Sequence, residues 1–129
     1  MAQVKIYGLK KQLEKVQAIL SDAIHSTIVE QLSFPQEKRF HRFISFEKEQ
    51  MLFPEDKSDA YMIIEIYMME GRTVETKKSL IKALFSKVSY ALNMNVNDIE
   101  IMIVESPACN WGFRGMSGDE IKLNYNVNV

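Results

Sequence analysis

The sequence predicts an α+β fold in which two consecutive β-α-β units form one two-layer sandwich. Each half of the chain has the pattern strand, helix, strand, and an offset of sixty residues superposes their apolar positions, with Ile6 falling on Ile66. Two such units predict two parallel crossovers on a shared sheet, with the helices on one face. We therefore expect a single domain over residues 1–129, with repeat halves at about 1–46 and 61–106 and a tail at 107–129.

The first half contains a short strand, a long helix and a second strand. Val4–Tyr7 is β-like, and the stretch 40–46, FHRFISF, is typical of a strand. Pro35 lies between the helix and the second strand and ends the helix, since the residue before a proline avoids the helical region. Apolar residues and one threonine recur at spacings of three and four and define the buried face of the helix: Leu13, Val16, Leu20, Ala23, Ile24, Thr27, Ile28 and Leu32.

The second half repeats this plan. Its first strand, 60–68, shows little alternation, so we expect it to be central and covered on both faces. Gly71 ends the strand, Thr73 is a candidate N-cap, and 99–105 is the return strand. The expected buried stripe of the helix is Leu80, Ile81, Leu84, Phe85, Val88, Ala91 and Leu92.

The connection and the tail are less regular. Residues 47–59 form a polar loop, with a short strand around Met51–Phe53 as one option. In the tail, apolar and polar residues alternate over Ile121–Val129, which is the period of a half-buried strand. Such a strand could pair with its own sheet or, as we favour, with a neighbouring subunit.

Length and composition indicate a soluble globular protein. The chain has 129 residues, 47% of them hydrophobic and 26% charged. A net charge of −1 and a pI of about 6.1 do not favour nucleic-acid binding. The apolar runs are shorter than the ~20 residues that span a bilayer, and the N-terminus has no signal-peptide pattern. Cys109 is the single cysteine, which fits a reducing cytoplasm.

The sequence has no phosphate loop or dinucleotide fingerprint, and we expect no cofactor. His25 and His41 lack a partner at ligand spacing, so no metal site is predicted.

Two stretches, GRTVETKK at 71–78 and NWGFRG at 110–115, follow the repeat in a distinctive order. With them, the chain resembles the tautomerase superfamily over nearly its whole length, in particular the branch similar to malonate semialdehyde decarboxylase. The resemblance implies the fold shared by macrophage migration inhibitory factor and 4-oxalocrotonate tautomerase. It also implies a homotrimer with pockets near the amino termini, close to subunit boundaries.

The resemblance also implies a set of site residues, with departures. Ala2 stands where the family has a catalytic proline, and Lys38 where decarboxylase-like members have an aspartate. Of a family Arg-Pro-Arg pair, only Arg72 is present. The aromatic wall is retained as Trp111 and Phe113. We therefore take Ala2, Lys38 and Arg72 as catalytic candidates.

Each candidate also has a structural interpretation. If Met1 is removed, Ala2 presents an α-amine with a pKa of about 7.7–8.0; if Met1 stays, Ala2 is an ordinary amide. Arg72 could clamp a carboxylate, or could be solvated or paired with Glu75 at the helix start. Trp111 could line a pocket or simply pack a core or an interface.

Three further charged residues are candidates beside these. Lys38 could form an imine or be a solvated turn lysine, and Glu37 could supply a displaced carboxylate. Arg39 and Arg114 are candidate substrate-binding residues, and Arg114 could equally be solvated.

Two functions follow from the resemblance. One is an enzyme that moves a proton in a small 2-oxo or 3-oxo carboxylic acid, or decarboxylates it. The other is a non-catalytic homotrimer that binds a small anion or a partner protein, having lost the catalytic proline.

Overall fold

The computed structural model describes residues 2–129; whether Met1 is retained concerns a residue outside this range. Six long elements follow one another: β1 (Ala2–Leu9), α1 (Lys10–Leu32), β2 (His41–Phe46), β3 (Met62–Met69), α2 (Val74–Leu92) and β4 (Ile99–Ser106). Short 3₁₀ helices lie at Lys48–Gln50, Val96–Asp98, Ala108–Asn110 and Gly118–Glu120, and a small hairpin is formed by β5 (Gly112–Phe113) and β6 (Met116–Ser117).

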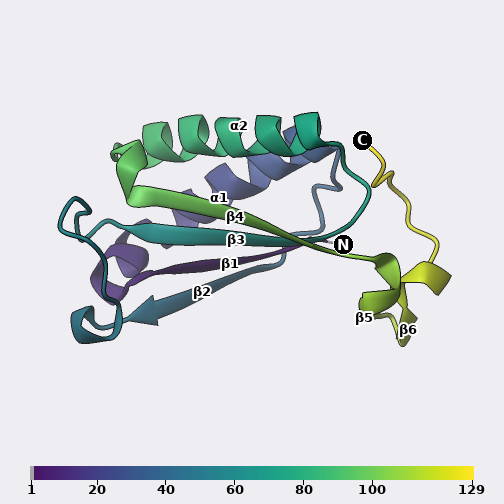
Figure 1. Cartoon of the computed structure of the whole chain (residues 1–129), viewed down its shortest axis with the longest axis horizontal. Helices are drawn as coiled ribbons and strands as arrows, with labels where there is room; N and C mark the ends of the chain where they lie inside the picture. The colour runs from purple at the N-terminus through teal and green to yellow at the C-terminus, as the bar shows by residue number, and fades with distance from the viewer. Residues whose placement is uncertain (1) are drawn as a thin grey trace.

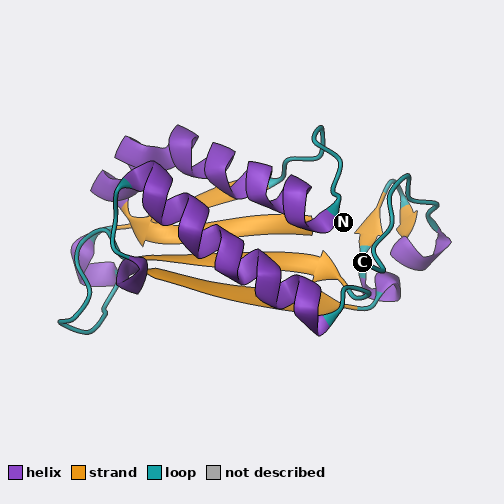
Figure 2. Cartoon of the chain, turned by 90° about the horizontal axis from the view of Figure 1, so that it is seen from above, coloured by secondary structure: helices purple, strands orange, loops and turns teal. Residues whose placement is uncertain are grey.

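The four long strands form one sheet in the order β2-β1-β3-β4. β1 and β2 are parallel, β3 and β4 are parallel, and β1 and β3 are antiparallel neighbours at the centre. Both long helices cover the same face of the sheet (Figures 1 and 2). The two β-α-β units and the central position of β3 are therefore confirmed.

Local sequence explains where the helices begin and end. The Thr73 side chain accepts a hydrogen bond from the Thr76 backbone N–H and so caps α2. Ser33 and Asn93, the residues that follow the two helices, both have φ of 50°, the left-handed conformation of many helix ends. The region predicted to be helical thus matches α1 and α2 closely.

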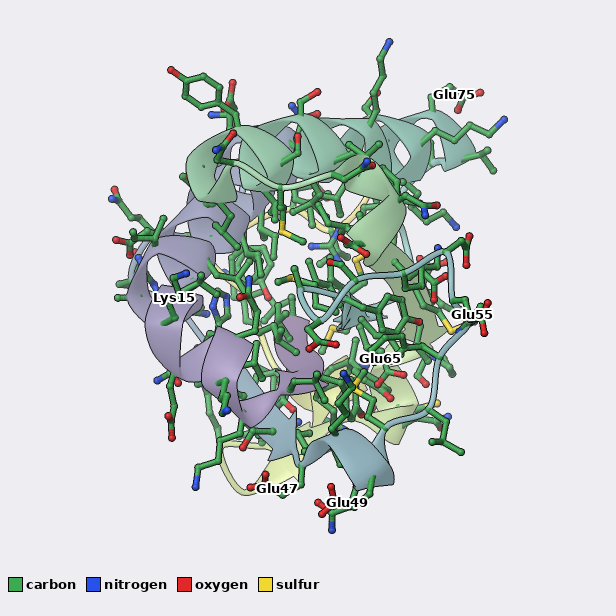
Figure 3. The ribbon with its side chains drawn as sticks, turned by 90° about the vertical axis from the view of Figure 1, so that its left-hand side faces the viewer. Lys15, Glu47, Glu49, Glu55, Glu65 and Glu75 are labelled. Atoms are coloured by element: carbon green, nitrogen blue, oxygen red, sulfur yellow. The ribbon has the colours of Figure 1, made fainter. Side chains whose placement is uncertain are left out.

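The core lies between the helices and the sheet, and Figure 3 shows side chains packed there in an end-on view. Ile6, Ile24, Ile64 and Leu80 are each completely buried in it. The predicted stripe of α1 is confirmed, with Val16 only partly buried. The stripe of α2 is narrower than predicted: it is fully buried only at Leu80, Leu84 and Val88, and Ala91 is exposed.

The other face of the sheet is only partly covered in the single chain. Burial alternates along β3, so Ile63, Glu65 and Tyr67 are half-buried on the side away from the helices. The expectation that both faces of this strand are covered is therefore not met within one chain, because both helices pack on the same side. On this open face Tyr7 and Tyr67 each donate a hydrogen bond to Glu65, at 2.8 and 3.0 Å.

The connection between the halves contains no strand at 51–53, so that option was wrong. The loop instead forms the 3₁₀ helix at Lys48–Gln50 and is held by the buried Asp98. This carboxylate accepts hydrogen bonds from the backbone N–H and hydroxyl of Ser58, at 2.8 and 2.6 Å. A hydrogen-bonded anchor replaces the expected strand pairing.

The tail forms no strand over 121–129 in the single chain, although burial alternates along it as predicted. A strand needs a ladder partner, and here the tail instead runs to the start of α2. The Val129 carbonyl accepts hydrogen bonds from the Thr73 N–H at 3.1 Å and the Thr76 hydroxyl at 2.8 Å. Pairing of this tail with a neighbouring subunit stays a prediction.

Candidate functional site

Most of the predicted site residues lie at one end of the sheet, and Arg39 is the exception. The amino end of β1, the carboxyl end of β3 and the start of α2 meet there, and both chain ends lie close together at this end (Figures 1 and 2). Ala2 is 4% exposed and pairs with Met68 of β3. The pairing of β1 with β3 thus places Ala2 at the end of the sheet where the chain continues from β3 toward Arg72.

Arg72 is the most unusual residue of this region. It is 5% exposed, and its Nη1 donates to the Met69 carbonyl at 3.1 Å. Its Nε and Nη2 are buried and have no acceptor among residues 2–129. Burial lowers the pKa of Arg72, while Tyr125 and Glu105 act to raise it. A buried guanidinium with two unsatisfied donors is costly unless something else supplies the acceptor.

The structure excludes the two alternative interpretations of Arg72, a solvated side chain and an ion pair with Glu75. A solvated arginine is excluded by its burial, and the ion pairs of the described residues include none between Arg72 and Glu75. The nearby carboxylate of Glu105 is already paired with Lys77 at 2.7 Å, with both side chains mostly buried. Arg72 therefore lies beside a neutralised pair rather than facing a carboxylate of its own.

Tyr125, in the tail, contacts the loop that follows α1. Its ring packs edge-on against Phe34 with centroids 5.1 Å apart, and the Lys38 Nζ lies 4.9 Å from its centroid. Burial raises the pKa of Tyr125, and the charges of Arg72 and Arg114 act against that rise. Lys38 is therefore half-buried against an aromatic ring rather than a freely solvated lysine.

The histidines support the loop that carries Lys38. The His25 Nε2 is hydrogen-bonded to the Gln36 carbonyl at 2.7 Å, and His41 Nδ1 is hydrogen-bonded to the Ser21 hydroxyl at 2.8 Å. The two rings pack edge-on, 5.8 Å apart. Burial, followed by electrostatic interactions with His25 and Arg39, lowers the pKa of His41 to about 4. Within residues 2–129 no three potential ligands cluster to hold a metal ion.

Neither Arg39 nor Glu37 forms a described side-chain hydrogen bond or ion pair with the residues at this end of the sheet. Arg39 Nη1 forms an ion pair with Asp22 of α1 at 2.6 Å, and its side chain is 42% exposed. Glu37 is exposed. The structure thus brings Lys38 and Arg72 to Tyr125 but engages Arg39 on the outer side of α1.

The NWGFRG stretch forms the β5–β6 hairpin. Arg114 and Gly115, the two turn residues, have φ of 55° and 77°, as a two-residue type I′ turn requires. The Arg114 guanidinium lies 5.7 Å from the Phe113 ring centroid. The hairpin surrounds an open hollow of about 530 Å³, lined by Trp111 and Phe113 among others.

Trp111 connects the hairpin to the sheet. A Cβ on Gly118 would lie 2.8 Å from Met69 Cε and 3.2 Å from Trp111 Cβ, so Trp111 and Met69 approach each other across this glycine. Met69 is also the residue whose carbonyl accepts from Arg72. Trp111 Nε1 is a further buried donor without an acceptor. Two of the predicted site residues thus carry all the orphaned buried side-chain donors found in the described chain.

Tyr125 and Phe34 were not predicted as site residues. The alternation of the tail places Tyr125 on its inward side, but that pattern does not reveal which part of the fold the inward side meets. Phe34 gave no signal beyond its position before Pro35.

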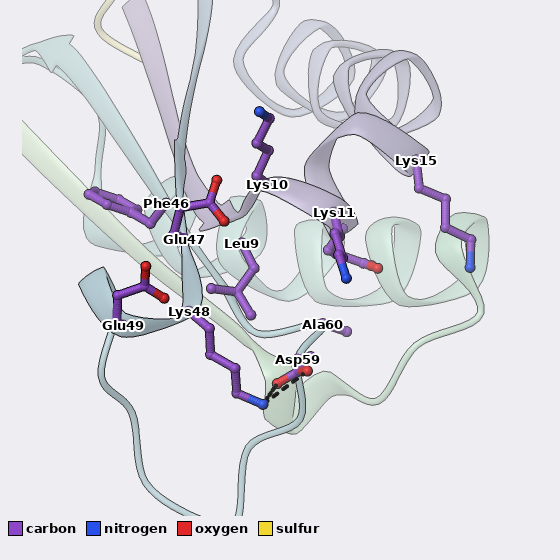
Figure 4. A pocket seen from close by; sticks show the side chains of 11 residues that line it. Leu9, Lys10, Lys11, Lys15, Phe46, Glu47, Lys48, Glu49, Asp59 and Ala60 are labelled. Atoms are coloured by element: carbon purple, nitrogen blue, oxygen red, sulfur yellow. Dashed lines mark hydrogen bonds and ion pairs between the residues drawn. The ribbon is translucent and has the colours of Figure 1, made fainter.

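A second hollow, of about 450 Å³, lies at the opposite end of the sheet (Figure 4). Lys10, Lys11 and Lys15 of α1 line it, and Lys48 pairs with Asp59 at 3.2 Å. These three lysines are exposed, so each can be satisfied by water. In the described chain no helix is long and apolar enough to cross a membrane.

Comparison with known proteins agrees with this geometry. The family described as "Tautomerase enzyme" matches residues 38–114, which is more than half of the chain. The chain is 24% identical to a probable tautomerase, YusQ, of Bacillus subtilis (strain 168) over 99 residues, 73% of this chain and 78% of that protein. It is 35% identical to 2-hydroxymuconate tautomerase of Pseudomonas putida over 57 residues, 44% of this chain and 90% of that protein.

Solved structures share the fold. A malonate semialdehyde decarboxylase superposes with a TM-score of 0.76 at 17% identity, covering 86% of this chain and 89% of its own. A fused 4-OT, described as a symmetric trimer, superposes with a TM-score of 0.78 at 20% identity, covering 91% and 96%. The family match over residues 38–114 and the shared two-unit fold lead to one conclusion: this chain belongs to the tautomerase superfamily.

Proposed function

We propose that this protein acts on a small 2-oxo or 3-oxo carboxylic acid, by enol–keto proton transfer or a related decarboxylation. One observation carries the proposal: Arg72 is buried, and its Nε and Nη2 find no acceptor in the part of the chain that the structure describes. A carboxylate presents two oxygens in the spacing that a guanidinium matches with two parallel hydrogen bonds. A bound carboxylate would therefore satisfy both orphaned donors at once.

The surroundings favour an anion. Lys38 and Arg114 lie close enough to act on Tyr125, as Arg72 does, and the carboxylate of Glu105 is held by Lys77. Excess positive charge in a partly desolvated region stabilises a carboxylate and the enolate formed when a proton leaves the carbon next to a carbonyl. The names of the relatives, a 2-hydroxymuconate tautomerase and a malonate semialdehyde decarboxylase, cover both proposed reactions.

Three groups compete to move the proton. The first is the α-amine of Ala2, which exists only if Met1 is removed; Ala2 lies at the correct end of β1. The second is Lys38, which packs against Tyr125. The third is Glu37, which is exposed and so is the least supported. In each case the base takes the enol hydroxyl proton, and a proton is delivered to the adjacent carbon.

We also propose that the protein is a cytoplasmic homotrimer. The open face of the sheet carries half-buried Ile63, Tyr67 and Val104 together with Met102, which is 59% exposed. A second subunit would remove this apolar surface from water. Sedimentation equilibrium should give about three times the chain mass of 15.0 kDa. A stable monomer at micromolar concentration would contradict this.

The alternative function is a non-catalytic trimer that binds a small anion. The observation that favours it is Ala2, which stands where the superfamily pattern has a catalytic proline. Both functions share the Arg72 site, and they differ only in whether a base acts on the bound acid.

Ketonisation of enol-phenylpyruvate separates the two functions. An enzyme should accelerate it above the buffer rate, and Arg72→Ala should abolish most of that acceleration. Ala2→Pro, in protein whose loss of Met1 is confirmed by mass spectrometry, should increase the rate because it supplies a secondary amine. If the wild type and Ala2→Pro both bind phenylpyruvate but ketonise the enol only at the buffer rate, the enzyme function is contradicted and the non-catalytic binding function is supported.

A further inference from the structure

The two donors of Arg72 that lack an acceptor are closed off from solvent in this structure. Arg72 is 5% exposed, and its Nε and Nη2 are buried and have no partner among residues 2–129. Arg72 also does not line the hollow that the β5–β6 hairpin surrounds. A ligand can therefore reach these donors from solvent only if a neighbouring segment moves.

The tail lies against the backbone on both sides of Arg72. A Cβ on Gly71, whose φ is 142°, would lie 2.8 Å from the Val127 carbonyl oxygen, so only a glycine allows the tail to come this close. On the other side of Arg72, the Val129 carbonyl accepts a hydrogen bond from the Thr73 N–H at 3.1 Å. The end of the tail thus crosses the chain at the residue before Arg72 and at the residue after it.

Among β3, α2 and the tail, only the tail lies outside a helix or strand. β3 is hydrogen-bonded to a strand on each side, and α2 is held by its own helical hydrogen bonds. Residues 121–129 belong to neither kind of element. The Val129 carbonyl, which also accepts a hydrogen bond from the Thr76 hydroxyl at 2.8 Å, fastens the tail to α2. Segments without ladder or helix bonds open at a lower free energy than strands or helices.

We propose that residues 126–129 form a strap that closes over Arg72 and lifts from the start of α2 to admit a ligand. The inference rests on the proposed function for the identity of that ligand, a small carboxylate. Tyr125, just before the strap, packs against Phe34 with ring centroids 5.1 Å apart and holds the tail at the base of the strap. Lifting then breaks the two hydrogen bonds of the Val129 carbonyl and leaves the sheet and α2 intact.

Hydrogen exchange of the Arg72 Nε–H, followed by NMR in the ligand-free protein, tests the opening itself. Thr76→Val keeps the shape of the side chain but removes the hydroxyl that holds Val129, so exchange should be about 2- to 12-fold faster than in the wild type. Thr76→Ser is the matched control, because it keeps the hydroxyl and should exchange at close to the wild-type rate. Unchanged exchange in Thr76→Val would overturn the proposal.

The backbone N–H of Ile64 distinguishes lifting of the strap from unfolding of the whole domain. Ile64 is completely buried in the middle of β3, so its amide exchanges when the sheet itself opens. In Thr76→Val, exchange should be faster at Arg72 and unchanged at Ile64. Equal acceleration at both residues would overturn the strap, since Arg72 would then reach solvent through global unfolding.

Line-shape analysis of the same Arg72 signal during a phenylpyruvate titration tests whether the strap controls entry. Association should be faster in Thr76→Val than in the wild type, by the same factor as the hydrogen exchange. An association rate that does not change in this variant would overturn the role of the strap in ligand entry. Absence of binding by the wild type would overturn the proposed function and with it the ligand of the strap, whereas a failed exchange test overturns the strap alone.

Discussion

The two ends of the sheet use their charged residues in opposite ways. At the end that carries the start of β1 and the tail, Arg72 is 5% exposed and two of its donors have no acceptor among the described residues. At the other end, Lys10, Lys11 and Lys15 line a hollow of similar size but are exposed, and the buried Asp98 accepts two hydrogen bonds from Ser58. A bound anion would therefore satisfy buried donors at the Arg72 end, whereas the exposed lysines at the other end can be satisfied by water.

This contrast shows that a hollow lined by charged residues does not by itself indicate a binding site in this fold. Exposed lysines around a hollow lose little by staying hydrated, so they place no demand on a ligand. A buried guanidinium without an acceptor lowers the free energy of unfolding. Proteins retain such destabilising groups mainly at functional sites, where a bound ligand supplies the missing acceptor. We therefore propose that the end of the sheet that carries Arg72 is the functional one.

The largest expected effect is on binding at the Arg72 end. Arg72→Ala should weaken phenylpyruvate binding by roughly 10- to 150-fold, because a charge-assisted hydrogen bond is worth about 1.5–3 kcal/mol. Lys11→Ala, at the opposite end, should leave affinity within about twofold, since an exposed lysine contributes little. Calorimetry on both variants compares the two ends directly. An equal loss from both would erase the distinction between them.

The next effect is on stability at the opposite end. Asp98→Ala removes the acceptor for both Ser58 donors and should lower the free energy of unfolding by about 2 kcal/mol, measured by urea denaturation. Ser58→Ala loses only the hydroxyl bond and should cost about half as much. Phenylpyruvate affinity should stay unchanged in both variants, and a loss of affinity would contradict a purely structural role for this anchor.

The pH dependence of the free energy of unfolding tests the role of His41, which packs against His25 beside the loop that carries Lys38. Burial lowers the pKa of His41 in the folded protein to about 4, against 6.5 for an unperturbed histidine. Between these values the unfolded chain binds more protons, so stability is full above pH 6.5 and falls as the pH drops toward 4. The loss should be roughly 1–2 kcal/mol, reduced from the full shift because His41 is half-buried. His41→Gln should show a shallower acid slope; an unchanged slope would contradict this.

The smallest expected effect is an increase in melting temperature, whereas most substitutions of buried residues lower it. Arg72→Met replaces an unsatisfied buried charge by an apolar chain of similar length, and should raise the melting temperature of the ligand-free protein by a few degrees. The corresponding loss of phenylpyruvate binding should match that of Arg72→Ala. A lower melting temperature would mean that Arg72 contributes more to the fold than its Met69 bond suggests.

Periodicity alone predicted most of the fold, because the apolar positions of two repeated β-α-β units are fixed by local geometry. It also placed Thr73 as a cap, which the structure confirms. The tail was different: alternation over Ile121–Val129 predicted a strand, and burial does alternate, but no ladder partner exists in one chain. Sequence pattern determines which side of a segment faces inward and not what that side meets.

The site, like the fold, could be predicted only in part from the sequence. Arg72 and Lys38 came from matching the family pattern, and the structure brings both to Tyr125. Arg39, one residue after Lys38, turns to Asp22 instead, since neighbouring side chains on an irregular loop can point apart. Tyr125 was missed because its ring packs against Phe34 and Lys38, which lie in the first half of the sequence, far from the tail.

The most direct test of the central claim is the NMR signal of the Arg72 side-chain Nε–H. The chain has four arginines, Arg39, Arg42, Arg72 and Arg114, and Arg72→Lys assigns the resonance by its disappearance. Titration with phenylpyruvate should shift the Arg72 signal saturably as its Nε–H gains an acceptor, while the signal of Arg39, already paired with Asp22, stays in place. An Arg72 signal that does not move at saturating phenylpyruvate would contradict the account.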